Sequence, residues 1–135
     1  MRVLLDTNIL LDVLLDRAPF VTDSSAIWAA CDGGRLVGVI PASTLTEIFY
    51  IARRATDRAT ARVAVGLCLA AFDICPVDRM TIEQASGLPG DDFEDNVLLA
   101  SAIIAGLDAV VTRNDRDFSA SSIPILTPAA LLARL

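Results

Sequence analysis

Val3-Leu4-Leu5-Asp6-Thr7-Asn8 is the stretch that decides the fold, and it begins at the third residue of the chain. A short apolar run ends abruptly in an acid, a hydroxyl and an amide. This pattern is typical of a buried parallel strand that carries polar groups to the carboxyl edge of a sheet. Ligand sites in open α/β sheets gather at that edge. We therefore expect Asp6 to belong to a functional site there.

Alternating apolar strands and helices follow this first strand. The turn signals and the apolar periodicity predict strands at 2–5, 36–40, 72–75, 109–111 and 123–126. They predict helices at 8–15, 23–31, 44–54, 57–71, 78–85, 91–105 and 129–134. Thr44 and Glu47 have the spacing of a capping box, which favours a helix start at Thr44. Such alternation implies right-handed crossovers and a parallel sheet with helices on both faces, so we expect one α/β domain over 1–135.

The composition narrows the chemistry available to the chain. Of its 135 residues 54% are hydrophobic, and the net charge is −6. There is no histidine, and every basic side chain is arginine, since the sequence contains no lysine. The missing histidine excludes Ser-His-Asp and Cys-His catalysis, and the missing lysine excludes a Schiff base or a P-loop lysine. Carboxylates are the main catalytic side chains that remain, and clustered carboxylates suit Mg²⁺ or Mn²⁺.

Four acids are the candidate catalytic and metal-ligating residues: Asp6, Glu47, Asp95 and Asp117. Asp6 and Asp117 follow predicted strands, whereas Glu47 and Asp95 lie in the first turns of predicted helices. Each acid also has an ordinary structural explanation, namely helix capping, the helix dipole or a turn. Their joint placement at one sheet edge favours a shared cation, because four uncompensated carboxylates would repel one another. Carboxylates around Mg²⁺ or Mn²⁺ suit phosphodiester hydrolysis.

The sequence resembles the PIN-domain nucleases, and within them it is most similar to the VapC-type toxins of toxin–antitoxin pairs. Four blocks in the family's order carry the resemblance over almost the whole chain: Leu4-Leu5-Asp6-Thr7-Asn8, Leu45-Thr46-Glu47, Asp92-Phe93-Glu94-Asp95 and Val111-Thr112-Arg113-Asn114-Asp115-Arg116-Asp117-Phe118. The resemblance implies a parallel sheet of about five strands and Mg²⁺- or Mn²⁺-dependent cleavage of RNA. It also implies homodimers and neutralisation by a small antitoxin that blocks the acidic site.

The resemblance assigns roles to particular residues. Asp6, Glu47 and Asp95 match the family's three regular acids, and Asp117 matches its more variable fourth acid. Supporting polar positions, expected to orient carboxylates and water, are matched by Thr7, Asn8, Thr112 and Asn114. Four neighbouring acids leave open which residues of the last two blocks face the metal site: Asp91, Asp92, Glu94 and Asp115.

Arginines and aromatic residues form further candidate surfaces. Arg54, Arg58 and Arg62 recur every four residues, so a continuous helix would place them on one face, either as an RNA-binding groove or as a solvated surface. Arg113 and Arg116 flank the last acid and are candidate RNA contacts. Further candidates are Trp28, Phe49 and Tyr50, for base stacking or core packing, and Phe20, Leu45, Ile48 and Phe49, for a homodimer or antitoxin surface.

Three functions compete on the sequence alone. The first is a metal-dependent endoribonuclease, either a toxin or a solitary RNA-processing enzyme. The second is a non-catalytic PIN-like binding module. The third is a phosphohydrolase or phospho-acceptor domain, which is disfavoured because Asn8 stands where the phosphatase pattern needs an acid. The start lacks a charged leader before a long apolar core, and no apolar run approaches a membrane span, so we expect a cytoplasmic protein.

Overall fold

A five-stranded parallel sheet forms the centre of the molecule. The computed structural model describes residues 1–118 and 121–135. The sheet order is β3-β2-β1-β4-β5, and every neighbouring pair is parallel. The strands are β1 (Arg2–Leu5), β2 (Val37–Pro41), β3 (Asp73–Cys75), β4 (Ala109–Val111) and β5 (Ile125–Leu126). The predicted parallel α/β architecture is therefore confirmed.

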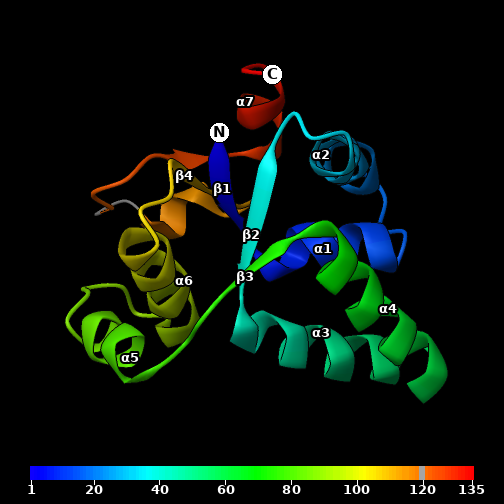
Figure 1. Cartoon of the computed structure of the whole chain (residues 1–135), viewed down its shortest axis with the longest axis horizontal. Helices are drawn as coiled ribbons and strands as arrows, with labels where there is room; N and C mark the ends of the chain where they lie inside the picture. The colour runs from blue at the N-terminus through cyan, green and yellow to red at the C-terminus, as the bar shows by residue number, and fades with distance from the viewer. Residues whose placement is uncertain (119–120) are drawn as a thin grey trace.

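Helices connect the strands and cover both faces of the sheet (Figure 1). They are α1 (Thr7–Leu14), α2 (Val21–Asp32), α3 (Ala42–Ala55), α4 (Arg58–Ala71), α5 (Arg79–Ser86), α6 (Phe93–Ile104) and α7 (Pro128–Leu132), with a short 3-10 helix η1 (Asp115–Phe118). Helices α3 and α4 form an arm on one side, and α5 and α6 form a lobe on the other (Figure 1). In the described residues, no helix is long and apolar enough to cross a membrane.

Alternate residues of the central strand face two different cores. Val3 and Leu5 pack in a large cluster with the inner residues of α1, α2, α3 and α4. Leu4 points the other way and packs in a second cluster with Leu98 and Leu99 of α6. Burial on both faces explains why β1 reads as a continuous apolar run rather than as an alternating one. It also makes β1 a rigid base for the polar residues that follow it.

The predicted capping box between Thr44 and Glu47 is wrong. Strand β2 runs into α3 without a loop, so the helix begins at Ala42 and Pro41 occupies its N-cap position. Thr44 lies buried inside the first turn. Glu47 therefore lies in the second turn, where its carboxylate has no backbone N–H to cap. This leaves Glu47 free for another role.

Candidate active site

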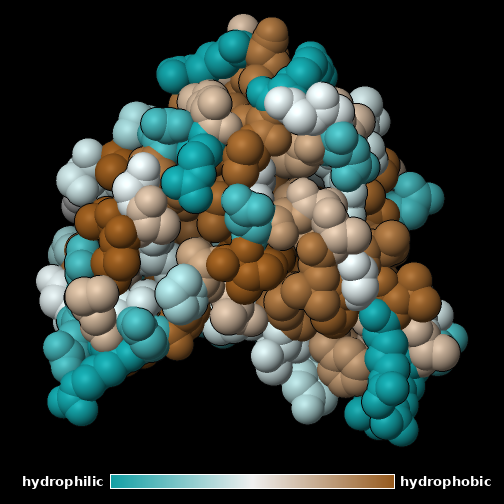
Figure 2. All heavy atoms as spheres, viewed as in Figure 1, coloured by the Kyte–Doolittle hydropathy of each residue, from teal (hydrophilic) through white to brown (hydrophobic). Residues whose placement is uncertain are grey.

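The carboxyl ends of β1 and β4 and the starts of α3 and α6 surround a cavity of about 640 Å³, here called the acidic cavity. Figure 2 shows this side of the molecule hollowed between the arm of α3 and α4 and the lobe of α5 and α6. Six acids line the cavity: Asp6, Glu47, Asp92, Glu94, Asp95 and Asp117. The structure thus brings the four sequence-predicted acids together.

Asp6 is the most buried of these acids, with 8% of its surface exposed. Its side chain makes no capping hydrogen bond to α1, although Asp6 occupies the N-cap position. Instead, the hydroxyl of Thr112 donates to Asp6 Oδ2 at 2.8 Å, and the same hydroxyl accepts from the Asn114 N–H at 3.1 Å. Burial raises the pKa of Asp6, and the Thr112 hydrogen bond lowers it in part. Thr112 makes the contact expected of a supporting residue.

Glu47 faces the other acids from α3. Burial raises the pKa of Glu47 to about 7, and the nearby carboxylates of Glu94 and Asp6 add to the effect. Both causes penalise the charged form of the carboxyl. Glu47 therefore changes its protonation near neutral pH, which is the range that suits a general base.

Asp95 lies in the first turn of α6, and its neighbour Asp92 fixes the helix start. Asp92 Oδ1 accepts from the Asp95 N–H at 3.1 Å, so Asp92 is the N-cap that the sequence did not assign. Burial raises the pKa of Asp95 to about 6, followed by the charges of Asp92, Asp6 and Asp117. An acid at the positive end of a helix is ordinarily stabilised in its charged form. The raised pKa of Asp95 is thus the opposite of the effect expected from the helix dipole alone.

The remaining acids divide between the acidic cavity and its surroundings. Asp117 lies on η1 with an exposed side chain and lines the acidic cavity. Asp92 and Glu94, whose register the sequence left open, line it too. Asp91 lines only a neighbouring cavity, and in the described residues Asp115 lines neither cavity. The sequence showed all these acids but did not indicate which of them line the cavity, because they lie in two short acidic stretches, 91–95 and 115–117.

The donor set suits a hard divalent cation by chemistry, since every titratable ligand it offers is a carboxylate oxygen. Three of these carboxyls have raised pKa values, so a cation would relieve the repulsion between their charged forms. Across residues 1–118 and 121–135, however, no group of three acids is close enough to form a complete metal site. The site thus fits Mg²⁺ or Mn²⁺ in ligand type, while the spacing requires side-chain movement or water-mediated contacts.

Three other supporting positions also line the acidic cavity. Thr7 is buried beside Asp6, and Asn8 lies half-buried on α1. Asn8 Oδ1 accepts a long hydrogen bond of 3.4 Å from Arg17. Asn114 is exposed and lines the cavity from the loop after β4. All four predicted supporting residues, including Thr112, thus lie at or beside the acids.

Arg113 points away from the acidic cavity into a buried ion pair. Its guanidinium lies against the fully buried carboxylate of Asp12, with Nε–Oδ2 at 3.1 Å and Nη2–Oδ1 at 3.2 Å. Ser24 also donates to Asp12 at 3.3 Å, and the ring of Phe20 covers the guanidinium at 3.8 Å. The pair joins α1 and α2 to the loop that carries Asp117. Sequence reasoning missed Asp12, although an acid inside an apolar run signals a buried partner.

The arginines predicted to share one helix face do not lie on one helix. Arg54 lies in the last turn of α3, whereas Arg58 and Arg62 lie on α4, whose N-cap is Asp57. The continuous face is therefore wrong, because the chain turns between the two helices. All three arginines are exposed, and in the described part of the chain none lines either cavity. Arg116 is exposed and lines the neighbouring cavity.

The aromatic residues divide between packing and exposure. Trp28 packs edge-on against Phe72 at 4.7 Å between centroids, next to the main core. Phe49 is half-buried and packs edge-on against Tyr50, which is 53% exposed. Among the apolar residues considered for a partner surface, Ile48 is fully buried and Leu45 packs against the core. Ile48 is therefore a core residue rather than part of such a surface.

A family model described as PIN domain matches residues 2–116. The chain belongs to the PIN-domain family. The match includes Asp6, Glu47 and Asp95 and ends one residue before Asp117. It confirms the resemblance drawn from the sequence, and it agrees with the parallel sheet and its acidic edge. No curated protein matches the sequence of this PIN domain.

Solved structures share the fold of this PIN domain over nearly its whole length. A toxin–antitoxin complex from Klebsiella pneumoniae is 25% identical, with a TM-score of 0.67, and the match covers 93% of this chain and 97% of that one. VapC20 from Mycobacterium tuberculosis, a sarcin–ricin loop cleaving toxin, is 17% identical, with a TM-score of 0.71 and coverage of 90% and 95%. DNA-bound VapBC from Salmonella typhimurium is 19% identical, with a TM-score of 0.69 and coverage of 95% and 98%.

Proposed function

We propose that this PIN domain is a metal-dependent endoribonuclease that uses Mg²⁺ or Mn²⁺ at the acidic cavity. The observation that carries the proposal is the gathering of six carboxylates at the carboxyl edge of the sheet, three of them with raised pKa values. Perturbed acids concentrated in one cavity are typical of a functional site. Membership of the PIN family and similarity to a toxin described as cleaving the sarcin–ricin loop favour RNA as the substrate.

The residues of the cavity take distinct roles in this proposal. Asp6, Glu47, Asp95 and Asp117 would hold the ion, which when bound polarises the phosphate and lowers the pKa of water. Thr112 keeps the Asp6 carboxylate in place through the 2.8 Å hydrogen bond. Glu47 would bind the ion directly or through water and help to orient the attacking water. Asp92 orients Asp95 by capping α6.

We also propose that the protein acts as the toxin of a toxin–antitoxin pair, as a homodimer in the cytoplasm. Several structures with the same fold are complexes of a toxin with its antitoxin, including the complex from Klebsiella pneumoniae. The net charge of −6 favours a basic partner by charge complementarity. A small antitoxin with basic residues would satisfy the acids of the cavity and so prevent ion and RNA binding.

The spacing of the acids favours one alternative, a non-catalytic binding module. Across the described residues no three acids form a complete metal site, and such a module would need none. The experiment that separates the two functions is cleavage of total RNA by purified, partner-free protein in Mn²⁺, in Mg²⁺ and in EDTA. The variant Asp6→Asn removes a buried acid of the cavity. The matched control Asp115→Asn removes an exposed acid that lines neither cavity.

The proposed nuclease predicts discrete cuts that need the metal, that persist in Asp115→Asn and that vanish in Asp6→Asn. Sequencing of the new RNA ends then identifies the target. Equal cutting by Asp6→Asn would show that the acidic cavity is not the site of cleavage. No cutting by a folded protein on several RNA sources would support the binding module.

A further inference from the structure

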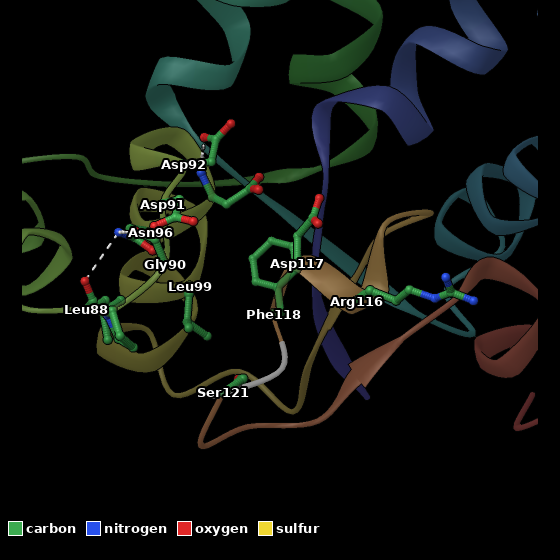
Figure 3. A pocket seen from close by; sticks show the side chains of 12 residues that line it. Leu88, Gly90, Asp91, Asp92, Asn96, Leu99, Arg116, Asp117, Phe118 and Ser121 are labelled. Carbon is green, nitrogen blue, oxygen red and sulfur yellow. Dashed lines mark hydrogen bonds between the residues drawn. The ribbon is translucent and has the colours of Figure 1, made fainter.

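A second cavity of about 570 Å³ lies directly beside the acidic cavity, here called the side cavity. Its lining residues are Leu88, Pro89, Gly90, Asp91, Asp92, Asp95, Asn96, Leu99, Arg116, Asp117, Phe118 and Ser121 (Figure 3). Asp92, Asp95 and Asp117 line both cavities and so form the wall between them. A group in the side cavity would therefore lie next to whatever reacts in the acidic one. The volume falls within the roughly 300–1,000 Å³ of ordinary ligand pockets.

Asn96 builds a fixed hydrogen-bond acceptor into the side cavity. The residue is only 8% exposed, and its Nδ2 donates to Gly90 O at 2.9 Å and to Leu88 O at 3.5 Å. The amide orientation follows from chemistry, because two carbonyl oxygens require the nitrogen on their side. Oδ1 is then the polar atom left over, and none of the described residues donates to it.

Gly90 provides the space that Oδ1 of Asn96 occupies. A Cβ at position 90 would lie 2.4 Å from this oxygen, well inside contact distance. Any side chain at this position would push the amide out of place. The close approach of Gly90 to Asn96 therefore belongs to the construction of the side cavity.

The side cavity has an apolar part, and the polar groups that line it are mainly acceptors, among them the carboxylates of Asp91, Asp92, Asp95 and Asp117. Asp91 contributes an exposed carboxylate, which lines this cavity and not the acidic one. The Ser121 hydroxyl already donates to Ile123 O at 2.8 Å, and Arg116 lines the cavity with its guanidinium directed away from the carboxylates (Figure 3). The apolar lining residues are Leu88, Pro89, Leu99 and Phe118. A flat group with an apolar face and N–H donors on its edge matches this arrangement.

We propose that the side cavity binds the base of the nucleotide beside the scissile phosphate and selects a base that carries an exocyclic amino group. This inference rests on the proposed RNA cleavage. Single-stranded RNA is recognised through splayed-out bases that pack on apolar surfaces and are hydrogen-bonded at their edges. Adenine, cytosine and guanine present N–H₂ donors to the acceptors of Asp91 and Asn96. Uracil presents a carbonyl oxygen where cytosine has its amino group, and this oxygen faces acceptors.

The first test is a nucleoside titration followed by NMR in metal-free buffer. Cytidine and uridine form a matched pair, because they differ at the edge that the acceptors of the side cavity would read. Cytidine is expected to shift the signals of Leu88, Leu99 and Phe118, with an affinity at least about tenfold above that of uridine. Equal binding of the two nucleosides, or shifts outside the side cavity, would overturn the proposal. So would binding of arginine amide in preference to cytidine, since that would indicate an arginine of a protein partner as the occupant.

The second test is base preference in cleavage, read from sequenced RNA ends. Asp91→Asn replaces a pure acceptor with a side chain that also donates, so discrimination against uracil is expected to fall from about tenfold towards equality. Asp115→Asn is the matched control, because it makes the same change at an exposed acid that lines neither cavity and is expected to keep the base ratio. An unchanged ratio in Asp91→Asn would refute the base site while leaving the nuclease intact. If the protein cleaves no RNA, the proposed function fails, and the cytidine titration still decides whether the side cavity binds a base.

Discussion

Replacing Glu47 by glutamine is expected to stabilise the protein at alkaline pH. In the folded protein the pKa of Glu47 lies at about 7, against 4.5 for an unperturbed glutamate. The folded state therefore binds the proton more tightly than the unfolded state. By linkage, the contribution of Glu47 to the free energy of unfolding is therefore most favourable below pH 4.5, and this contribution is lost as the pH rises through 7.

The magnitude follows from the same difference in pKa. Each pKa unit corresponds to about 1.4 kcal/mol, so the full difference would destabilise the charged form by roughly 3 kcal/mol. Glu47 is only half-buried, and screening by solvent reduces this to about 1–2 kcal/mol. Glu47→Gln removes the charge and nearly preserves the shape. We expect it to raise the free energy of unfolding by about 1–2 kcal/mol at pH 8 and to leave it almost unchanged at pH 4.

The assay is urea denaturation of both proteins at pH 4 to 8 in EDTA, followed by circular dichroism. The unfolding free energy of the wild type should fall between pH 4.5 and 7 more steeply than that of Glu47→Gln. Adding Mn²⁺ at pH 8 should stabilise the wild type more than the variant, because a bound cation compensates the charge. The reasoning is refuted if the variant is less stable at pH 8, or if the two pH profiles run parallel.

Three further predictions concern the surroundings of the acidic cavity. Thr112→Val removes the hydroxyl that donates to the buried Asp6 carboxylate, so the affinity for Mn²⁺ measured by calorimetry should fall about tenfold. An unchanged affinity would contradict the supporting role of Thr112. Arg113→Met removes the closest charged partner of the buried Asp12 carboxylate, which keeps only the longer contact to Arg17 at 3.9 Å, and should lower the free energy of unfolding in chemical denaturation by about 3 kcal/mol. Adding Asp12→Leu should recover part of this loss, whereas simple additivity of the two substitutions would show that the two groups do not interact. Gly38→Ala would place a Cβ within 3.0 Å of three side chains and should lower the free energy of unfolding by about 1–3 kcal/mol. The control Gly66→Ala, which has open space around it in α4, should raise the free energy of unfolding by about 0.5–1 kcal/mol in the same assay. Equal effects of the two substitutions would contradict the packing around Gly38.

The local sequence was sufficient to predict those strand bounds and helix starts that depend on neighbouring residues alone. Strands β1 and β4 have the predicted bounds, because a fully buried strand is an uninterrupted apolar run with a polar end. Thr127 caps α7 by accepting from the Ala130 N–H, and Pro128 follows as its first residue, one position before the predicted start at 129. The start of α3 was misplaced because β2 runs directly into the helix, which no cap signal marks.

The parts of the site that sequence could not give depend on contacts between distant residues. The pair of Asp12 and Arg113 joins positions 101 residues apart, so no local pattern links them. Of the acids at 91–95, Asp91 lines only the side cavity and Glu94 only the acidic one, a division that depends on how the start of α6 lies against other elements. The acceptor in the side cavity depends on how the amide of Asn96 lies against a loop carbonyl.

The central claim is that the acidic cavity binds a divalent cation at the carboxyl edge of the sheet. Anomalous scattering from crystals soaked in MnCl₂ locates such an ion without relying on activity. The account predicts an anomalous peak between Asp6, Glu47 and Asp95, and its loss in crystals of Asp6→Asn. Crystals of the wild type with no peak in this cavity, at a Mn²⁺ concentration that supports RNA cleavage in solution, would contradict it.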